Sequence, residues 1–526
     1  MWILYDNVVT IMVAAVACAF AWLFGGTIAD VLTPVAPWLF AILLELMLCF
    51  PQRRPGETTY EARERVWQAL KADPLTWVVV GFLALLAVPF FNAGLCEACD
   101  YAAIQFGGAD PAPPIPFIPY CVNRLHHMNV VMWFAPALTA MLAVTHALCK
   151  RGKRLFVELV VWNGVALAAI GFLQQVTGAA APLWIDTPGV QAYFFSTFGY
   201  PNMGGDYFTT LFGLAVGLWR WNLDSIRAER RARGDDKVLE ANHAKFWRRH
   251  YHLIPAAIFF VAALTTLSRA SIILVTLLAV VFAAHSFVFA FARMKREKRV
   301  RASALGFLAL VGVVLCMVLF TPADLQREVD TLNTSAVLDR VTGKGQYHVR
   351  VATEIWKDHP LFGCGGWGYK HLCLTKMTEK DLRNIQITGG INVHNDYLQF
   401  LAEHGIVGFG CLVAIVILLL APLSGDLRQM ARSVRFLPAK DQPPRPVSLF
   451  IVPAPVFCIL MTATATFIHG FGDCPLRSPA VLTLFFTSLA AMDGFMPHIQ
   501  ANPEEEAARH RRRRHPHRHG DHPRHH

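Results

Sequence analysis

The chain has 526 residues, of which 54% are hydrophobic and only 16% are charged. Soluble domains carry roughly 25% charged residues, so this composition excludes a soluble globular protein and predicts an integral membrane protein. The net charge of +11 comes without any interleaving of basic and aromatic residues, which argues against nucleic-acid binding.

Apolar runs of helix length recur along nearly the whole chain. A bilayer core needs roughly 20 apolar residues of helix to cross it. The sequence therefore predicts an all-α, polytopic membrane domain over residues 1–502, with about twelve transmembrane helices. The first run follows MWILYDN, which lacks the basic residues of a secretory signal, so we expect a retained helix. The runs are 8–28, 31–50, 75–92, 128–149, 155–175, 203–221, 251–268, 270–292, 303–320, 398–421, 448–468 and 479–497.

Lysine and arginine gather in the connections that follow the even-numbered runs. By contrast, 176–202 has no basic residue and 93–127 has only Arg124. Because short basic connections stay in the cytoplasm, we expect both termini to be cytoplasmic and the odd-numbered connections to face the periplasm. The basic residues are Arg53, Arg54, Arg63, Arg65, Lys71, Lys150, Arg151, Lys153 and Arg154, with further sets in 220–249, 293–301 and 428–445.

A predicted periplasmic loop, residues 321–393, separates the ninth and tenth runs. A connection this long is more often functional than passive. Within it, GQYHVRVATEIWKDHP predicts a short helix that is ended by Pro360. The Arg- and His-rich segment 503–526 predicts a disordered cytoplasmic tail, which suits anionic lipid headgroups better than a metal ion.

Six of the twelve cysteines lie outside the apolar runs. An oxidising periplasm permits a disulfide such as Cys364 to Cys373, although spacing alone does not assign one. A zinc site built on Cys96 and Cys99 lacks matching histidines. The six are Cys96, Cys99, Cys121, Cys364, Cys373 and Cys474.

Two arginines are candidate functional residues. Arg269 lies between two apolar runs, in LTTLSRASIILV, with no room for a conventional loop. An arginine at membrane depth is costly, so Arg269 either has a partner or extends its guanidinium to the outer headgroups. Arg350 lies on the predicted loop helix, where Glu354 four residues later allows an ordinary surface pair.

His394 and Asn395 stand just before the tenth apolar run. Asn395 or Asp396 is the expected helix N-cap, and Gly405 interrupts the segment. His394 is either structural or a general base, because a neutral imidazole takes up a proton near neutral pH. Arginine binds phosphate bidentately, so one histidine and two arginines suit transfer from a lipid diphosphate to a hydroxyl.

Five stretches, in order, resemble the O-antigen ligase and polymerase superfamily. His394 and Asn395, followed after nine residues by Gly405 and after two more by Gly408, reproduce its H-[NSQ]-x9-G-x-x-G pattern. The other stretches are STFGYPNMGGDYF, LTTLSRAS, RVATEIWKDHPLFGCGGWGY and FIHGFGDCPLRSPA, the last with the family's D-x-P-L element. The resemblance covers a ligase-like core at roughly 190–490, and the first five runs match only in hydropathy.

The resemblance implies a GT-C-like helical fold with an outward-facing cavity for an undecaprenyl-diphosphate-linked glycan. On the family pattern His394 is the general base, and Arg269 and Arg350 hold the diphosphate as it leaves. Family enzymes are thought to work without nucleotide or metal, and this chain has neither a P-loop nor a convincing carboxylate cluster. Further substrate-binding candidates, for which capping, buried pairing or snorkelling are structural alternatives, are Asn202, Asn395, Glu403 and Arg477.

Three acceptors are compatible with this chemistry: a lipid A-core sugar for a ligase, the growing glycan for a polymerase, and a Ser or Thr hydroxyl for a protein O-oligosaccharyltransferase. The complete HN-x9-G-x-x-G spacing favours the ligase. A transporter of lipid-linked sugars is the alternative of another class, but transporters tend to show internal repeats and broken helices at the midplane. A purely structural scaffold leaves Arg269 and the long loop unexplained.

Overall fold

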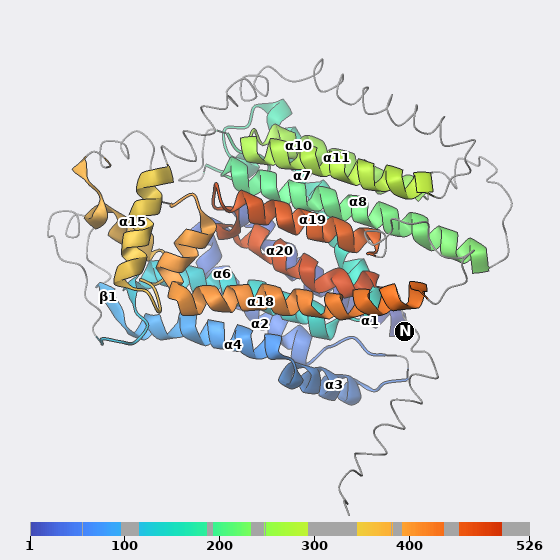
Figure 1. The fold of residues 1–526 in the computed structure, drawn as a ribbon, viewed down its shortest axis with the longest axis horizontal. Coiled ribbons are helices and arrows are strands. Elements are labelled where there is room, and N and C mark those ends of the chain that lie inside the picture. The colour runs from blue at the N-terminus through green and yellow to red at the C-terminus, as the bar shows by residue number, and fades with distance from the viewer. Residues whose placement is uncertain are drawn as a thin grey trace, which may run out of the picture.

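The computed structural model describes residues 2–54, 56–95, 115–186, 193–232, 247, 249–292, 345–379, 381, 392–435 and 452–496. The predicted ninth run at 303–320, the tail at 503–526, Cys96, Cys99 and parts of the predicted loop, including 321–344, lie outside the described residues. Within the described part the chain is almost entirely helical, as predicted, and most helices lie side by side along the long axis of the molecule (Figure 1).

Where the structure describes the chain, the secondary structure consists of helices and one pair of very short strands. The helices are α1 (Trp2–Trp22), α2 (Ala29–Leu48), α3 (Thr59–Ala72), α4 (Pro74–Ala87), α6 (Arg124–Leu142), α7 (Lys150–Thr177), α8 (Pro201–Ala232), α10 (Leu253–Thr265), α11 (Arg269–Ala292), α15 (Gly345–Asp358), α16 (Gly368–Leu372), α18 (Asp396–Arg435), α19 (Ala454–His469) and α20 (Pro479–Ala491). Short helical turns are η1 (Phe24–Gly26), η2 (Val88–Phe91), η3 (Ala143–Ala147), η4 (Pro182–Trp184), η6 (Cys373–Lys376), η8 (Pro475–Arg477) and η9 (Met492–Phe495). Strands β1 (Ala93–Leu95) and β2 (Cys121–Asn123) pair in parallel, with Ala93 opposite Cys121.

Seven of the described helices are long and apolar enough to cross a membrane, by length and composition alone. These are Leu4–Trp22, Ala29–Leu48, Pro74–Phe91, Arg124–Ala147, Lys150–Thr177, Arg269–Val288 and Asp396–Gly425. Three further apolar helices are shorter, namely Leu253–Thr265, Ala454–His469 and Pro479–Phe495. Helix α8 has 32 residues, but its sequence includes Asp206, Arg220 and Asp224. The described residues are therefore consistent with a polytopic membrane protein, while twelve spans and the GT-C-like topology stay predictions.

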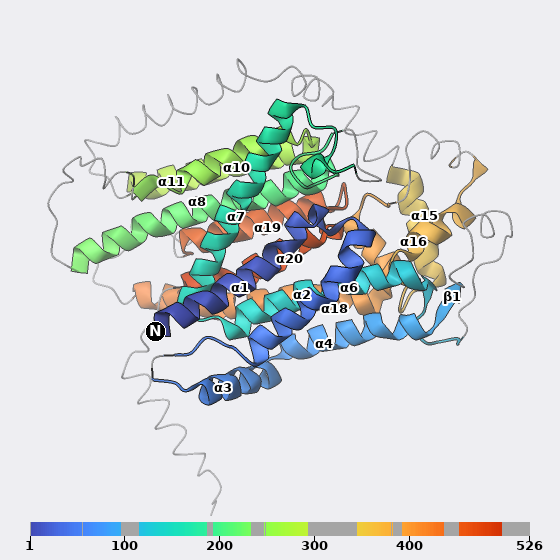
Figure 2. The same cartoon turned by 180° about the vertical axis from the view of Figure 1, so that it is seen from behind.

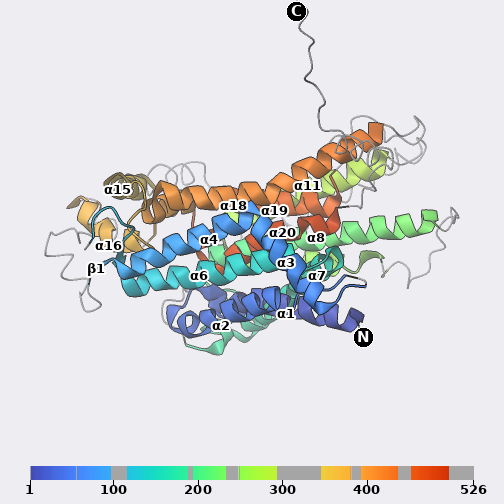
Figure 3. The same ribbon diagram turned by 90° about the horizontal axis from the view of Figure 1, so that it is seen from below.

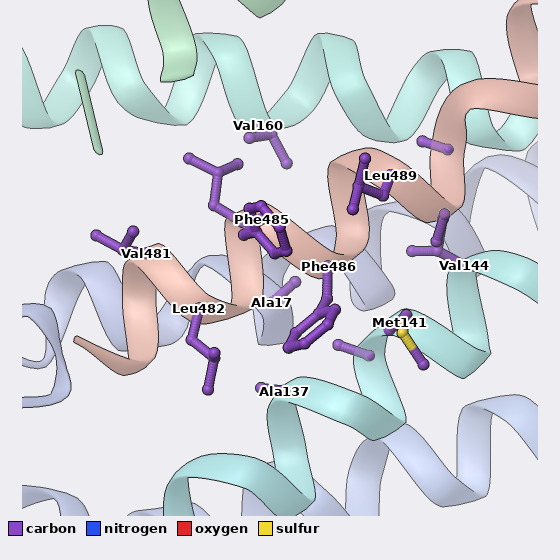
Figure 4. Close-up of a cluster of buried hydrophobic side chains, with 14 of the residues drawn as sticks. Ala17, Ala137, Met141, Val144, Val160, Val481, Leu482, Phe485, Phe486 and Leu489 are labelled. Atoms are coloured by element: carbon purple, nitrogen blue, oxygen red, sulfur yellow. The ribbon is translucent and has the colours of Figure 1, made fainter. Parts of the chain in front are cut away.

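Helix α20 lies at the centre of the bundle because its sequence is apolar on every side. All residues from Pro479 to Ala491 are buried. Its Phe485 and Phe486 lie among side chains from α1, α6 and α7, including Ala17 and Met141 (Figure 4), and α1 and α7 cover it from behind (Figure 2). Helices in a membrane are held by close van der Waals packing rather than by hydrophobic transfer. This packing fixes the turn that precedes α20.

Helix α18 is broken at Gly405, as the sequence predicts. Gly405 has φ 63° and ψ −174°, a left-handed conformation that favours glycine. A Cβ there would lie 2.2 Å from the carbonyl oxygen of Leu361. Beside the break, the backbone N–H groups of Ile406 and Val407 donate to the carbonyls of Pro360 and Leu361 at 2.9 and 3.1 Å. The segment that follows α15 is thereby fixed to α18.

The described parts of the predicted loop include α15 and α16, which pack at the end of the bundle where α18 begins (Figures 1 and 3). We term this region the α15 end. Helix α15 ends at Asp358, just before Pro360, which confirms the predicted short helix. Cys364 and Cys373 are both buried and free, so the disulfide that the sequence permits is not formed.

Candidate active site

His394 lies immediately before α18, at the α15 end. Asn395 caps this helix, because its side-chain oxygen accepts the backbone N–H of Leu398 at 3.0 Å. His394 has φ 54°, an uncommon left-handed value for a residue with a Cβ. Its imidazole is 43% exposed, and its Nδ1 lies 3.3 Å from Oδ1 of Asp473. His394 is therefore an accessible ring that is held from one side.

Asp473 is a buried acceptor on which several donors converge. It lies in the turn between α19 and α20, and its side chain is only 9% exposed. Its carboxylate accepts hydrogen bonds from the Tyr200 hydroxyl at 3.1 Å, from the Asn202 amide, and from the Cys474 backbone N–H at 2.8 Å. Burial raises the pKa of Asp473, but the hydrogen bond from His394, with the neighbouring histidines and the Cys474 backbone N–H, lowers that pKa to about 2. Asp473 is thus ionised at neutral pH.

The ionised carboxylate determines which nitrogen of His394 carries the proton. A carboxylate only accepts hydrogen bonds, so Nδ1 of the neutral imidazole must donate to Asp473. The lone pair then lies on Nε2, on the other side of the ring. A buried carboxylate prepares the imidazole of serine hydrolases in the same way. The geometry therefore gives His394 the tautomer that a general base requires.

Asn202 and Asn395 both have structural partners. The Asn202 amide donates to Asp473 and to the Tyr200 hydroxyl, the latter at 3.1 Å. Asn395 caps α18, and its amide donates to the carbonyl of Phe471 at 3.2 Å. The capping alternative for Asn395 is confirmed. The predicted contacts of both amides with sugar or phosphate oxygens stay predictions.

Arg350, on α15, pairs with one carboxylate of its own helix and with one farther along the chain. Its Nη1 lies 2.9 Å from Glu354, and its Nη2 lies 2.5 Å from Asp381. The surface pair with Glu354 that the sequence allows is present, and Asp381 is an additional partner that the sequence did not indicate. Residues two apart on a helix point about 200° apart, so Arg350 points away from the side of α15 on which His348 meets His394. Its predicted role at a diphosphate therefore competes with an existing ion pair.

Arg269 is the first residue of α11. The preceding Ser268 accepts the backbone N–H of Ser271 at 3.3 Å and so caps the helix. The first turn of α11 packs closely on α8, since a Cβ at Gly205 would lie 2.3 Å from the Ser271 hydroxyl. The first turn of α8 also carries Asn202, which contacts Asp473. Arg269 thus begins its helix at the α15 end, and its contact with a substrate stays a prediction.

Glu403 and Arg477 form a buried ion pair, with Nη1 of Arg477 2.9 Å from the carboxylate and both side chains almost fully buried. The Gln399 amide donates to Glu403 at 3.1 Å, and the Arg477 guanidinium lies 4.2 Å from the ring centre of Trp367. The buried-pair alternative is confirmed for both residues. The pair joins α18 to the turn before α20, and sealed side chains are poorly placed to meet a substrate.

Arg477→Met is expected to lower the free energy of unfolding by about 3–5 kcal/mol, because it leaves the buried Glu403 unpaired. Replacing both residues with methionine is expected to recover most of this loss, since no lone charge remains buried. Lys376→Met is the control, because it breaks a partly exposed pair with Asp358 at 2.8 Å and should cost about 0–1 kcal/mol. Thermal unfolding of the detergent-purified protein checks this, and equal losses for the two single variants would contradict it.

Residues 254–413 match the family model described as O-antigen ligase. Over these residues the chain is similar to the O-antigen ligase family. The resemblance seen in the sequence is confirmed there, and the O-antigen ligase segment contains Arg269, Arg350, His394 and Glu403. The family indicates a glycosyltransferase-like membrane enzyme. No curated protein matches the chain.

Several residues that surround His394 in the structure were not predicted from the sequence. Asp473 and Tyr200 were among them. So was a buried pair on neighbouring helices, in which Nδ1 of His469 lies 3.1 Å from Asp206. All four stand in the quoted stretches STFGYPNMGGDYF and FIHGFGDCPLRSPA, so the signal was present. Their pairing joins positions more than two hundred residues apart, which one sequence does not reveal.

His394, Asp473 and Cys474 place one donor atom each within 4.8 Å of one another. Cysteine binds metals as a thiolate, but burial raises the pKa of Cys474 well above its ordinary range. The Asp473 oxygens also already accept hydrogen bonds from Tyr200 and Asn202. These residues therefore fit a metal ion poorly. The metal-free chemistry expected of the O-antigen ligase family stays a prediction.

Proposed function

We propose that this chain transfers a glycan from an undecaprenyl-diphosphate donor to an acceptor hydroxyl at the periplasmic face of the bacterial inner membrane. In this proposal the acceptor is a lipid A-core sugar, so the reaction is O-antigen ligation. The observation that carries it is the accessible His394, held through Nδ1 by the buried Asp473, in a chain that is similar to the O-antigen ligase family over residues 254–413.

The proposed reaction is a single displacement at the anomeric carbon of the donor. Nε2 of His394 takes the proton of the acceptor hydroxyl while the hydroxyl oxygen forms its bond to that carbon. The bond from the anomeric carbon to the diphosphate oxygen breaks, and undecaprenyl diphosphate leaves with the electron pair. Asp473 stabilises the imidazolium that forms. One displacement inverts the anomeric centre.

Arg269 and Arg350 stabilise the negative charge that builds on the leaving diphosphate. Cations that are fixed in a poorly solvated site do this better than water does. To reach a diphosphate at His394, Arg350 has to exchange its ion pairs with Glu354 and Asp381 and turn toward the side of α15 that carries His348. Donor binding is thereby coupled to the position of α15.

Arg269→Lys and Arg350→Lys are each expected to reduce transfer by about tenfold or more, because lysine keeps the charge but loses the planar fork that binds phosphate bidentately. Asp381→Asn is the matched variant, since it removes one of the two carboxylates that hold the Arg350 guanidinium and should leave transfer near the wild-type rate. Steady-state transfer by the purified protein is the measurement.

Wild-type transfer by both lysine variants would contradict bidentate phosphate binding. If Asp381→Asn reduces transfer as much as Arg350→Lys does, the role of Arg350 is to hold α15 through its ion pair with Asp381. The proposed contact between Arg350 and the diphosphate would then be refuted.

Deleting the gene and separating the surface glycans of the cell on a gel tests the proposed acceptor. Loss of all long-chain lipopolysaccharide, with accumulation of lipid-linked polymer on the periplasmic side, supports ligation. Single repeats on the core indicate a polymerase instead. Normal lipopolysaccharide with unglycosylated proteins indicates a protein O-oligosaccharyltransferase, and lipid-linked glycan trapped on the cytoplasmic side indicates a transporter.

A further inference from the structure

A second histidine, His348, stands beside the proposed base. It lies on α15, is only 4% exposed, and its ring centre is 5.9 Å from that of His394, with the two planes at 67°. Aromatic rings in contact prefer such edge-to-face arrangements. Neither the family pattern quoted above nor the proposed mechanism assigns His348 a role. Its position on the inner side of α15 places a second imidazole at the site.

The other partner of His348 is the hydroxyl of Tyr369, which lies 2.9 Å from its Nδ1. Tyr369 is completely buried, and within the described part of the chain its hydroxyl has no other hydrogen-bond acceptor. Leaving a buried donor unsatisfied costs about 1–3 kcal/mol. The hydroxyl therefore donates to Nδ1 of His348, and the ring proton resides on Nε2.

Nε2 of His348 has no hydrogen-bond partner among the described residues, and it is not sealed from solvent. Burial, and then the neighbouring His394, lower the pKa of His348 to about 4. The ring is therefore neutral at neutral pH and does not compete with His394 for the acceptor proton. What it presents beside His394 is one fixed, neutral N–H donor.

We propose that Nε2–H of His348 donates a hydrogen bond to an oxygen of the lipid-linked glycan donor while that donor is bound at His394. This inference rests on the proposed function and deepens it, because it names a substrate-binding residue beyond the family pattern. Tyr369 acts through His348 and is a positioning residue, since its hydroxyl selects the tautomer. The oxygen that accepts this hydrogen bond belongs to a sugar or a phosphate of the lipid-linked glycan, and both kinds of oxygen present the same chemistry to the N–H group.

A pair of amide substitutions separates the two nitrogens of His348. In His348→Gln the amide nitrogen occupies roughly the place of Nε2, whereas in His348→Asn it occupies roughly the place of Nδ1. We expect His348→Gln to keep kcat/KM for the lipid-linked donor within about threefold of wild type. His348→Asn should lose about tenfold, chiefly through KM for that donor, as the loss of one hydrogen bond predicts. The KM for the acceptor should not change.

Equal kcat/KM for the two variants, or a better Asn variant, would overturn the inference and leave His348 with a purely structural bond to Tyr369. If either variant fails to fold, the double variant His348→Phe with Tyr369→Phe replaces it, because no orphan hydroxyl remains. The same tenfold loss is expected there, and wild-type kcat/KM would overturn the inference. His394→Ala is assayed in the same experiment. If His394→Ala is active, the proposed function itself is refuted. If His394→Ala is inactive and His348→Asn is fully active, only the proposed role of His348 is refuted.

Discussion

Replacing His394 with alanine is expected to reduce glycan transfer by about 10²–10⁴-fold, which is the usual contribution of a positioned general base. The imidazole is nearly half exposed and makes one described side-chain hydrogen bond, to Asp473, so its removal should leave the packing of the bundle intact. The measurement is complementation of a gene deletion, with surface glycan and membrane-inserted protein quantified in the same cells.

His359→Ala is the matched control for this substitution. His359 also lies within residues 254–413, just after the end of α15. Its imidazole lies 2.8 Å from the Tyr120 hydroxyl, which has no part in the proposed chemistry. We expect this variant to transfer glycan at close to the wild-type rate. Transfer by His394→Ala at the wild-type rate would refute the catalytic assignment.

Asp473→Asn is expected to reduce transfer by up to about 10⁴-fold, the loss found when the equivalent carboxylate of a serine protease triad becomes an amide. An amide can donate to Nδ1 of His394, which moves the ring proton to Nε2 and removes the lone pair that the base needs. The pKa of Asp473, about 2, keeps the wild-type carboxylate ionised. Transfer should therefore not depend on the titration of Asp473 at any pH above about 4.

Asp493→Asn is the control, because Asp493 pairs with Lys153 at 2.7 Å in the turn after α20 and is half exposed. It should transfer at the wild-type rate. Since Asp473 also accepts from Tyr200 and Asn202, the thermal unfolding of Asp473→Asn is measured as well. A well-folded Asp473→Asn protein with full activity would show that His394 does not depend on this carboxylate.

The features of the fold that the sequence predicted are those with local causes. Hydropathy indicated the helices, Pro360 indicated the end of α15, and Gly405 indicated the break in α18. Each depends on a few consecutive residues, whose backbone preferences act in any context. The number of membrane spans is harder to predict from local sequence, because apolar helices such as α10 and α20 are shorter than a full span in the structure.

The site was only partly predictable because its contacts join distant positions. His394 was identified from its motif, but its partner Asp473 lies 79 residues later, and the D-x-P-L element gave no indication of which residue it faces. Arg350 illustrates the opposite case. Its pair with Glu354 follows from helical spacing, yet Asp381, 31 residues away, also holds its guanidinium. For Glu403 and Arg477, the sequence offered buried pairing only as an alternative, and packing selected it.

The most direct test of the central claim is a reconstituted transfer reaction. Wild-type and His394→Ala proteins are placed in liposomes with an undecaprenyl-diphosphate-linked glycan and a lipid A-core acceptor, without nucleotide. Released undecaprenyl diphosphate is then measured against glycan attached to the acceptor. We predict equal amounts of the two products for the wild-type protein and almost none for His394→Ala. Equal product formation by both proteins, or attached glycan without release of undecaprenyl diphosphate, would contradict a displacement driven by His394.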